Sequence, residues 1–373
     1  MIIGIDASRA VTARRTGTEA YAYFLIRALV PQAAERGHSL LLYYNQPPPD
    51  HFAAAAHVTP LIMPFPRLWS HLRLALRLHY QPPDVFFTPA HVIPFSYRGP
   101  AVATIHDLGY RFFPEAHPVT QRHYLHWSTA HNSRRSRRII ADSQATRTDL
   151  VTEYGVDGTK VDVVYPGYDP GLKRPSAAKI TAVLHRHQIT PPYLLYLGTL
   201  QPRKNLVRLV EAFAASGLAA ATPPYQLVLA GKVGWLAQPI LDTVARLDPI
   251  TAQQIRLPGY IAEPEKAALL AGATALVFPS LYEGFGFPVL EAQACETAVI
   301  TANTSSLPEV VGEAGLLIDP LDTGAISRAM VQICRDEALR RRLVSAGQKN
   351  IRRFSWEKAA AQVLTSLENA VGR

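Results

Sequence analysis

The sequence predicts an α/β protein of two domains, each a doubly wound parallel sheet covered by helices. Its 373 residues exceed what one ordinary hydrophobic core organises. Short apolar runs alternate with amphipathic segments along the whole chain. Proline, glycine and charge interrupt this alternation in the stretch "DPGLKRPSAAK". We therefore expect domains at 1–170 and 171–355, with a last helix at 356–373 that packs back on the first domain.

Apolar runs predict the strands. In the first half they are expected at 2–6, 40–44, 85–87, 102–106, 138–141 and 161–165. In the second half they are expected at 193–198, 226–230, 255–257, 275–278, 298–301 and 315–318. Helical patterns separate most of these strands, and Ser355 is expected to open the last helix. Sheets of this kind bind ligands at the carboxyl ends of their strands, and the two domains are expected to form a cleft.

Composition and charge narrow the class of protein. The chain is 48% hydrophobic and 18% charged, which is typical of a globular protein. No apolar run reaches the roughly 18 residues of a membrane span, and the N-terminus predicts a first strand, not a signal peptide. The net charge of +9 indicates an anionic partner, but no recognition motif for nucleic acid accompanies it. The two cysteines, Cys295 and Cys334, fit a reducing cytoplasm.

The first candidate site is the stretch "PSLYEGFGFPVLEAQAC". Its pattern predicts a loop after a strand, with Glu283 projecting from this exposed loop and Glu291 in the first turn of the following helix. Free N–H groups at such a helix start favour an anion. A lone Glu291 could simply complement the helix dipole. That interpretation explains neither Glu283 nor Gly284 and Gly286, which permit close approach of the backbone to a ligand.

The second candidate site is the Arg203–Lys204 pair after the strand at 193–198. Both residues are expected at the N-terminus of a helix that starts near Asn205. Two cations there oppose the helix dipole, which makes sense if the site holds a strong anion such as a diphosphate. The alternative is a pair of solvated cations that tolerate a penalty below ~1 kcal/mol.

Two weaker candidates lie in the first half. His106 ends a strand, where a histidine is often purely structural, and Gly17 opens the first helix at a position that commonly faces phosphate. His123 and His126 stand three positions apart, but no third ligand is evident, so a zinc site is not expected. The chain also contains no Asp-x-Asp pair. The sequence therefore predicts no metal.

Taken in order, these segments resemble a known family. "YEGFGFPVLEA" is similar to the E-x7-E motif of retaining glycosyltransferases of family 4, which have the GT-B fold of two Rossmann-like domains facing a cleft. "GTLQPRKN", "LVLAGKVGW" and "SSLPEVVGEAGLLIDP" also match in the second half, as do "TIHDL" and "IIADSQATRTDL" in the first. The resemblance covers nearly the whole chain. Within the family, it is most similar to bacterial mannosyltransferases of polysaccharide assembly.

The resemblance implies roles at the matching positions. Arg203 and Lys204 would grip the donor diphosphate, and Glu291 would bind the ribose hydroxyls. Glu283 would contact the transferred sugar, and His106 would face the sugar ring. The other donor contacts would come from Gly17 beneath the phosphates, from the backbone of Gly284, Phe285, Gly286 and Phe287 near sugar and phosphate, and from Tyr260 and Ile261 beside the base. The N-terminal loop has one glycine where many relatives have two.

The predicted reaction moves a hexose, with mannose favoured, from a nucleotide-diphosphate sugar to a glycan or lipid-linked acceptor. The resemblance implies retention of configuration, no cofactor, and GDP-mannose in preference to a UDP-hexose. A sugar-nucleotide-binding module without turnover and an epimerase of the same fold are the alternatives. The intact Glu283–Glu291 and Arg203–Lys204 pairs favour the transferase.

The acceptor side is expected in the first half of the chain. Residues 65–80 predict a basic amphipathic helix with Trp69, Leu72 and Leu76 on one face. This helix and the "RRSRR" run at 134–138 could meet the inner face of a membrane and a lipid-linked acceptor. The alternative is a helix packed on its own sheet with solvated arginines. We expect a cytoplasmic protein, with peripheral membrane contact as one interpretation and no nucleic-acid partner.

Overall fold

The computed structural model describes residues 1–12, 17–48, 55–90 and 92–372. The chain forms two compact units. The N-terminal unit contains Met1–Gly167 together with Phe354–Arg373, and the C-terminal unit contains Tyr168–Arg353. The chain thus passes between the units twice, close to the positions 170 and 355 expected from the sequence.

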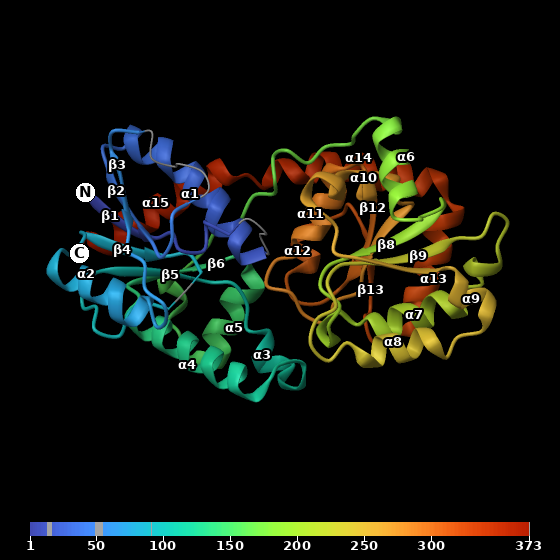
Figure 1. The fold of residues 1–373 in the computed structure, drawn as a ribbon, viewed down its shortest axis with the longest axis horizontal. Coiled ribbons are helices and arrows are strands. Elements are labelled where there is room, and N and C mark those ends of the chain that lie inside the picture. The colour runs from blue at the N-terminus through green and yellow to red at the C-terminus, as the bar shows by residue number, and fades with distance from the viewer. Residues whose placement is uncertain (13–16, 49–54, 91, 373) are drawn as a thin grey trace. The chain divides into compact units, whose positions relative to one another are not determined.

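The N-terminal unit is built on a parallel sheet with seven strands among the described residues, in the order β3-β2-β1-β4-β5-β6-β7. The strands are β1 Ile2–Asp6, β2 Ser39–Tyr44, β3 Val58–Ile62, β4 Val85–Thr88, β5 Ala101–Ile105, β6 Arg138–Ala141 and β7 Val161–Val163. The helices are α1 Gly17–Glu35, a π-helical turn at Ser70–Leu74, α2 Ala75–Tyr80, α3 Gly109–Phe112, α4 Val119–Arg135, α5 Gln144–Tyr154 and α15 Trp356–Val371. Helix α15 returns to this unit, packs along α1, and lies across the sheet from α4 and α5 (Figure 1).

The C-terminal unit has a six-stranded parallel sheet in the order β10-β9-β8-β11-β12-β13. The strands are β8 Tyr193–Leu197, β9 Gln226–Ala230, β10 Ile255–Gly259, β11 Ala275–Phe278, β12 Ala298–Ala302 and β13 Leu316–Ile318. The helices are α6 Ala177–Arg186, α7 Leu206–Ala215, α8 Gln238–Ala245, α9 Pro249–Gln253, α10 Glu263–Gly272, α11 Phe287–Ala294, α12 Leu307–Val311, α13 Thr323–Arg335 and α14 Glu337–Asn350. The predicted pair of doubly wound parallel sheets is confirmed.

Burial explains why the sequence signal for most strands was clear. Strands β4, β5, β8, β9, β11 and β12 are buried at every residue, as parallel strands covered on both faces should be. Strand β3, which the sequence analysis missed, lies at the edge of its sheet, is mostly exposed and contains Pro60. A proline is tolerated at an edge, but it removes the pattern by which a strand is predicted.

Each sheet reverses its strand order beside its first strand, between β1 and β4 and between β8 and β11. Loops at the carboxyl ends of strands on either side of such a point diverge and leave room for a ligand. In the C-terminal unit the loops after β8 and β9 lie close together, because the backbones of Gly198 and Gly231 are in contact. A Cβ at Gly231 would lie 1.9 Å from the Gly198 carbonyl oxygen, and φ there is +147°. Only glycine fits this approach.

The segment 65–80 differs from the helix that the sequence predicts. Trp69 is buried, whereas Leu72 and Leu76 are half exposed, so these three side chains do not share a face. The cause is the π-helical turn, in which the N–H of Leu74 donates to the Trp69 carbonyl at 2.9 Å, five residues back. This wider turn shifts the side chains that follow it relative to an α-helix.

The run 134–138 is largely explained by the fold. Arg135 donates to a backbone carbonyl in the loop after β4 at 2.7 Å, and Arg137 to one near the end of α15 at 2.9 Å. Arg138 forms an ion pair with Asp162 through two hydrogen bonds. Three of its four arginines therefore hold their own unit together, which favours the structural interpretation of this charge.

Candidate active site

The switch point of the C-terminal sheet brings together the loop after β8 and the loop after β11. Arg203 and Lys204 lie in a separate 3-10 turn, Pro202–Lys204, and not in the first turn of α7. Asn205 ends that turn in the left-handed conformation, with φ +62°, and α7 starts only at Leu206. The helix thus starts close to Asn205 as expected, and the two cations stand directly before it in the chain, with Asn205 turning the backbone between them and α7.

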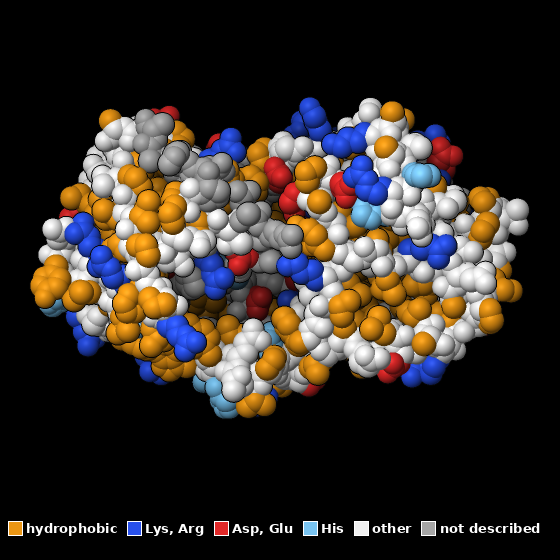
Figure 2. Space-filling view, in the orientation of Figure 1, with side chains coloured by type: hydrophobic (Ala, Val, Ile, Leu, Met, Phe, Trp, Pro, Cys, Tyr) orange, Lys and Arg blue, Asp and Glu red, His pale blue; other side chains and the backbone are white. Residues whose placement is uncertain are grey.

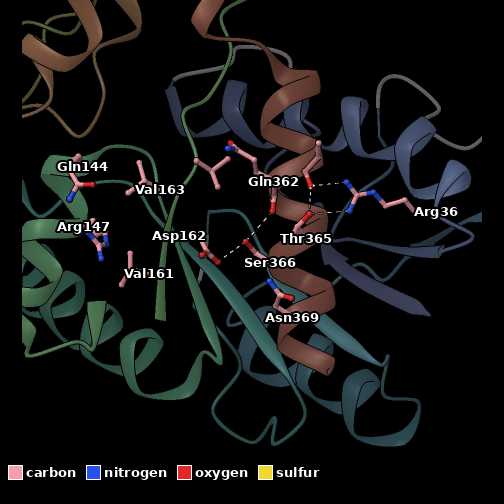
Figure 3. A pocket seen from close by; sticks show the side chains of 12 residues that line it. Arg36, Gln144, Arg147, Val161, Asp162, Val163, Gln362, Thr365, Ser366 and Asn369 are labelled. Atoms are coloured by element: carbon pink, nitrogen blue, oxygen red, sulfur yellow. Dashed lines mark hydrogen bonds between the residues drawn. The ribbon is translucent and has the colours of Figure 1, made fainter. Parts of the chain in front are cut away.

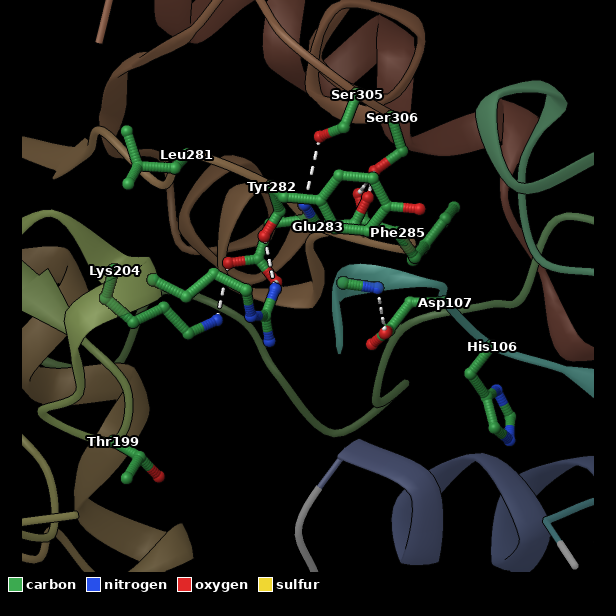
Figure 4. Close-up of polar contacts among 12 residues, drawn as sticks. His106, Asp107, Thr199, Lys204, Leu281, Tyr282, Glu283, Phe285, Ser305 and Ser306 are labelled. Carbon is green, nitrogen blue, oxygen red and sulfur yellow. Dashed lines mark hydrogen bonds and ion pairs between the residues drawn. The ribbon is translucent and has the colours of Figure 1, made fainter. Parts of the chain in front are cut away.

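The two cations converge on one carboxylate (Figure 4). Lys204 Nζ lies 2.5 Å from Glu283 Oε1, and Arg203 Nη1 lies 3.2 Å from Oε2. The three side chains are only 10–12% exposed. Glu283 was expected to project from an exposed loop, and this is wrong, because the switch point folds both loops inward. The result is a buried ion triad of Arg203, Lys204 and Glu283 with a net charge of +1.

The electrostatics of the triad keep the carboxylate ionised. Burial alone would raise the pKa of Glu283, but Lys204 and Arg203 outweigh it and hold the pKa below its usual value. Lys204 Nζ also lies 5.3 Å from the centroid of the Phe278 ring, a cation–π contact. At neutral pH the triad is therefore two cations sharing one anion, an arrangement able to attract a further anionic group.

Glu291 belongs to a different ion pair. It is the fifth residue of α11, beyond the first turn where it was expected, so the helix-dipole alternative loses its basis. Its Oε1 accepts a hydrogen bond from Lys266 Nζ at 2.8 Å, and Lys266 also pairs with Glu263 at 2.9 Å. Burial would lower the pKa of Lys266, but the two carboxylates raise it. Among the described residues, Oε2 of Glu291 has no hydrogen-bond partner and can accept one from a ligand.

The stretch between these two glutamates is largely buried, and a glycine sets its path into α11. Gly286 precedes α11 with φ +109°, and a Cβ there would lie 2.8 Å from Leu307 Cδ2. Gly284 and Phe285 lie in the loop, and Phe287 is the first residue of α11, with its ring 5.2 Å from that of Phe285. A side chain at Gly286 would be strained and crowded, so glycine is required where the chain enters the helix.

Tyr260 and Ile261 follow β10 on the same edge of the sheet. Tyr260 is 41% exposed, whereas Ile261 is 6% exposed. Lys232 Nζ lies 5.5 Å from the centroid of the Tyr260 ring. Of the two predicted base-contacting residues, only Tyr260 therefore offers a broad side-chain surface to a ligand.

His106 follows β5 in the N-terminal unit, and its ring is held from three sides. Nδ1 lies 2.6 Å from Asp142 Oδ2, Nε2 lies 2.8 Å from the Pro89 carbonyl oxygen, and the Tyr21 ring stands edge-on at 4.7 Å. A carbonyl only accepts, so Nε2 carries a proton. Burial acts to lower the pKa of His106, but Asp142 outweighs it and the pKa is raised. Both ring nitrogens are thus engaged within the unit.

The remaining candidates can be placed only in part. Gly17 opens α1 and is exposed, and residues 13–16 just before it lie outside the described residues. His126 Nδ1 is hydrogen bonded to the Tyr154 hydroxyl at 2.8 Å. Within the described ranges, no three His, Cys, Asp or Glu side chains gather as a metal site would require.

Asn205 is a site residue that the sequence analysis missed. Its side-chain amide donates to the Pro279 carbonyl at 3.1 Å and to the Pro320 carbonyl at 2.6 Å, and it is 4% exposed. It thereby ties the turn that carries Arg203 and Lys204 to the end of β11. The signal was available, because asparagine is among the few residues that adopt the left-handed conformation readily.

The N-terminal unit also contains an open cavity of about 490 Å³ between β7, α5 and α15 (Figure 3). Several of its polar side chains have hydrogen-bond partners within the unit. Ser366 Oγ donates to Asp162 at 2.7 Å, Arg147 donates to the Gly158 carbonyl at 3.1 Å, and Arg36 pairs with Glu368 at 3.0 Å. None of the candidate site residues lines this cavity.

Comparisons with protein-family profiles and with known proteins point to a single class of protein. Profiles for "Glycosyltransferase Family 4" and "Glycosyl transferases group 1" match residues 15–172 and 184–350. The O-antigen chain mannosyltransferase B of Escherichia coli is 32% identical over 267 residues, which cover 71% of this chain and 69% of that protein. The serotype-specific mannosyltransferase WbdA of Escherichia coli is 33% identical over 189 residues, 50% of this chain and 23% of WbdA.

Solved structures show the same fold at lower identity. Anabaena HepE in complex with UDP and glucose superposes with a TM-score of 0.73 at 19% identity, covering 98% of this chain and 99% of HepE. Sucrose-phosphate synthase from Thermosynechococcus elongatus superposes with a TM-score of 0.77 at 22% identity, covering 99% and 98%.

Two Rossmann-like units, with an Arg–Lys pair and a glutamate at the switch point of the second, define a glycosyltransferase of the GT-B fold. The chain belongs to glycosyltransferase family 4, and within that family it resembles the bacterial mannosyltransferases of polysaccharide assembly.

Replacing the triad carboxylate should destabilise the fold, contrary to what an exposed loop residue would do. Glu283→Gln leaves two buried cations without a counter-charge, and we expect a loss of about 3–5 kcal/mol in the free energy of unfolding. Urea denaturation at pH 7 measures this loss. The control is Glu337→Gln, which breaks an exposed pair with Arg341 and should change the free energy by less than about 0.5 kcal/mol.

The pH dependence of the free energy of unfolding tests the direction in which the pKa of Glu283 is shifted. The folded pKa of Glu283 is lowered, so its stabilisation is complete above the ordinary value of 4.5 and is lost as pH falls through the folded pKa. The difference between wild type and Glu283→Gln should therefore stay constant between about pH 8 and 5 and shrink only below that range. Equal stability of the two proteins at pH 7 would contradict the triad.

Proposed function

We propose that the protein transfers a hexose, with mannose favoured, from a nucleotide-diphosphate sugar to a glycan or lipid-linked acceptor, with retention of configuration and without a metal ion. The observation that carries this proposal is the buried triad of Arg203, Lys204 and Glu283 at the switch point. Similarity to two mannosyltransferases of Escherichia coli supports mannose and hence GDP-mannose over a UDP-hexose. No cofactor is required by this proposal.

The triad supplies the charge that the reaction needs. As the sugar–oxygen bond breaks, negative charge grows on the leaving diphosphate, and catalysis requires fixed positive charge at that point. Arg203 can form two parallel hydrogen bonds with phosphate oxygens, and Lys204 offers a compact charge. Glu283 holds both cations in place in the buried triad.

Donor binding then exchanges one anion for another. In the structure, the Glu283 carboxylate is paired with both cations. A diphosphate carries more negative charge and competes for the same donors. We infer that Glu283 is released from at least one cation when the donor binds, and that its freed oxygen accepts a hydrogen bond from a hydroxyl of the transferred sugar.

The other donor contacts are assigned to side chains that can still accept a hydrogen bond from a ligand or pack against it. Glu291 is oriented through Oε1 by Lys266, and its Oε2 can accept a ribose hydroxyl. The exposed ring of Tyr260 can pack on the base. His106 is retained as the candidate contact of the N-terminal unit with the sugar, with Asp142 fixing its ring.

We place the acceptor with the N-terminal unit, at or near a membrane surface. Leu68, Leu72, Leu76 and Tyr80 follow one another at intervals of four residues and are 50–73% exposed, with Arg73 and Arg77 among them. Figure 2 shows hydrophobic side chains gathered with Lys and Arg side chains over this part of the unit. No helix in the described ranges is long and apolar enough to cross a bilayer, so contact would be peripheral. Both cysteines are buried and free, which supports a reducing, cytoplasmic side of that membrane.

A donor screen tests the function and its independence of metal together. The metal-stripped protein is incubated in excess EDTA with GDP-mannose, UDP-glucose, UDP-galactose and a mannose-terminated oligosaccharide, and release of nucleoside diphosphate is measured. GDP-mannose should react fastest, and the product should keep the anomeric configuration of the donor. Arg203→Ala and Lys204→Ala should each cost about 2–4 kcal/mol in kcat/KM. Activity that vanishes on stripping and returns with Mg²⁺ or Mn²⁺ would refute the role of the cations.

If Glu283 and the diphosphate compete for the same cations, removing the carboxylate should increase the affinity of the protein for nucleoside diphosphate. Glu283→Gln removes the competitor for Arg203 and Lys204, so nucleoside diphosphate alone should bind about 10-fold more tightly, a gain of about 1.4 kcal/mol. Sugar transfer should be lost in the same variant. Isothermal titration with GDP and UDP measures the affinity, with Glu337→Gln as the control. Unchanged or weaker binding would show that Glu283 does not compete for the cations.

Peripheral membrane contact is tested by sedimentation with vesicles. Wild type should bind vesicles rich in phosphatidylglycerol more than vesicles of phosphatidylcholine, because apolar insertion and arginine charge act together. Replacing Leu72 and Leu76 by Ser should reduce this binding about 5-fold or more while leaving transfer to a short, water-soluble acceptor intact. Equal sedimentation of the variant and wild type would exclude this surface.

A further inference from the structure

Three consecutive hydroxyl residues after β12 hold the loop that carries Glu283. Thr304 Oγ1 donates to the Leu281 carbonyl at 3.2 Å, and Ser305 Oγ accepts from the Glu283 N–H at 2.9 Å. Ser306 Oγ lies 2.9 Å from the Glu283 carbonyl oxygen and 2.8 Å from that of Phe285. Figure 4 shows Ser305 and Ser306 reaching the loop on the side away from Lys204. These three side chains, residues 304–306, form a hydroxyl cradle.

Ser306 departs from the usual behaviour of a serine in its position. It stands directly before α12, where a serine side chain ordinarily accepts a hydrogen bond from the first turn of its own helix. No such bond is made. The hydroxyl is fully buried and instead serves two carbonyls of the neighbouring loop with its single hydrogen. A side chain that gives up the cap of its own helix to contact another loop is a local exception of the kind found at functional sites.

Ser305 shows a second exception. It has φ +51°, a left-handed conformation that costs a non-glycine residue about 1 kcal/mol or more. This conformation accompanies the contact of its hydroxyl with the Glu283 N–H. Both backbone groups of Glu283 are therefore taken by the cradle, the N–H by Ser305 and the carbonyl by Ser306.

The opposite side of the loop is fixed by the residue that pairs with Glu283. The Leu281 N–H donates to the Arg203 carbonyl at 3.0 Å, and the Arg203 guanidinium donates to the Tyr282 carbonyl. The loop at 281–285 is thus gripped between the turn of Arg203 on one side and the hydroxyl cradle on the other. When a diphosphate draws Arg203 and Lys204 away from the carboxylate, the cradle still fixes the backbone of Glu283.

We propose that Thr304, Ser305 and Ser306 are positioning residues for sugar transfer. They keep the Glu283 backbone in place during the exchange of anions, so that the released carboxylate meets the sugar and does not follow the cations. The proposal rests on the proposed function, because it needs Glu283 to act on the sugar. A displacement of about 1 Å at such a contact can lower a rate by about 100-fold, which is why a fixed backbone matters.

A matched pair of isosteric variants separates positioning from stability. Thr304→Val removes a hydroxyl bonded to the loop, whereas Thr301→Val removes one bonded at 3.0 Å to the Phe278 carbonyl, inside the sheet. We expect Thr304→Val and Ser306→Ala to lower kcat about 10–100-fold with less than about a threefold change in the donor KM. Thr301→Val should lower Tm at least as much, with kcat within about threefold of wild type. Thr304→Ser, which keeps the hydroxyl, should restore most of the lost kcat.

Hydrogen exchange tests the cradle without relying on activity. The Glu283 amide should be protected in wild type and in Thr301→Val, and should exchange about 10-fold faster or more in Ser305→Ala, measured with saturating GDP. Unchanged exchange in Ser305→Ala would overturn the cradle. The role of the cradle in transfer would be overturned if kcat fell only in proportion to Tm, in the same way for Thr304→Val and Thr301→Val. It would also be overturned if Thr304→Ser did not restore kcat. If the wild-type protein were inactive with every donor, the proposed function would be refuted. The hydrogen-exchange rate of the Glu283 amide would still show whether the cradle holds the backbone.

Discussion

The arrangement of the site depends on one buried carboxylate that balances two buried cations. Arg203 and Lys204 are only 11–12% exposed, and Glu283 is the counter-charge that offsets the cost of burying them, because unpaired buried cations are strongly destabilising. Glu283 in turn depends on them, because burial alone would raise its pKa and the two cations lower it. Each loop at the switch point therefore stabilises the other, and the fold holds a net positive charge in place before any substrate arrives.

The backbone around this triad takes conformations that most residues avoid. Asn205, Gly286 and Ser305 all have left-handed φ values, of +62°, +109° and +51°. Each lies where a chain must turn sharply to bring a side chain or an amide to the triad. Strain of this kind persists only where the surroundings impose it, and here the surroundings are the amide contacts of Asn205, the Leu307 side chain below Gly286 and the hydroxyl contact of Ser305.

The sequence alone predicted the arrangement of strands and helices, but it did not predict which side chains contact one another. Buried parallel strands are continuous apolar runs, so most of them could be placed, whereas β3 could not because Pro60 and exposure remove the pattern. Arg203 and Glu283 are 80 positions apart, and no spacing rule links them. The contacts of Glu291 with Lys266 and of Ser306 with the loop are long-range as well. Local signals in the sequence suggested the candidate site residues, whereas only the fold shows which groups each of them contacts.

The same contacts support the proposal that transfer proceeds without a divalent ion. A metal would bring two positive charges together with the carboxylates that bind it, leaving a small net charge at the phosphates. The triad also combines two positive charges with one carboxylate, but its parts are held by the protein backbone. In the proposed exchange the carboxylate leaves the cations when a diphosphate binds, and the site would then gain an acceptor for the sugar together with its anion. Under this proposal the carboxylate that offsets part of the charge of Arg203 and Lys204 is the group freed to act on the sugar, and its backbone must stay where the fold has placed it.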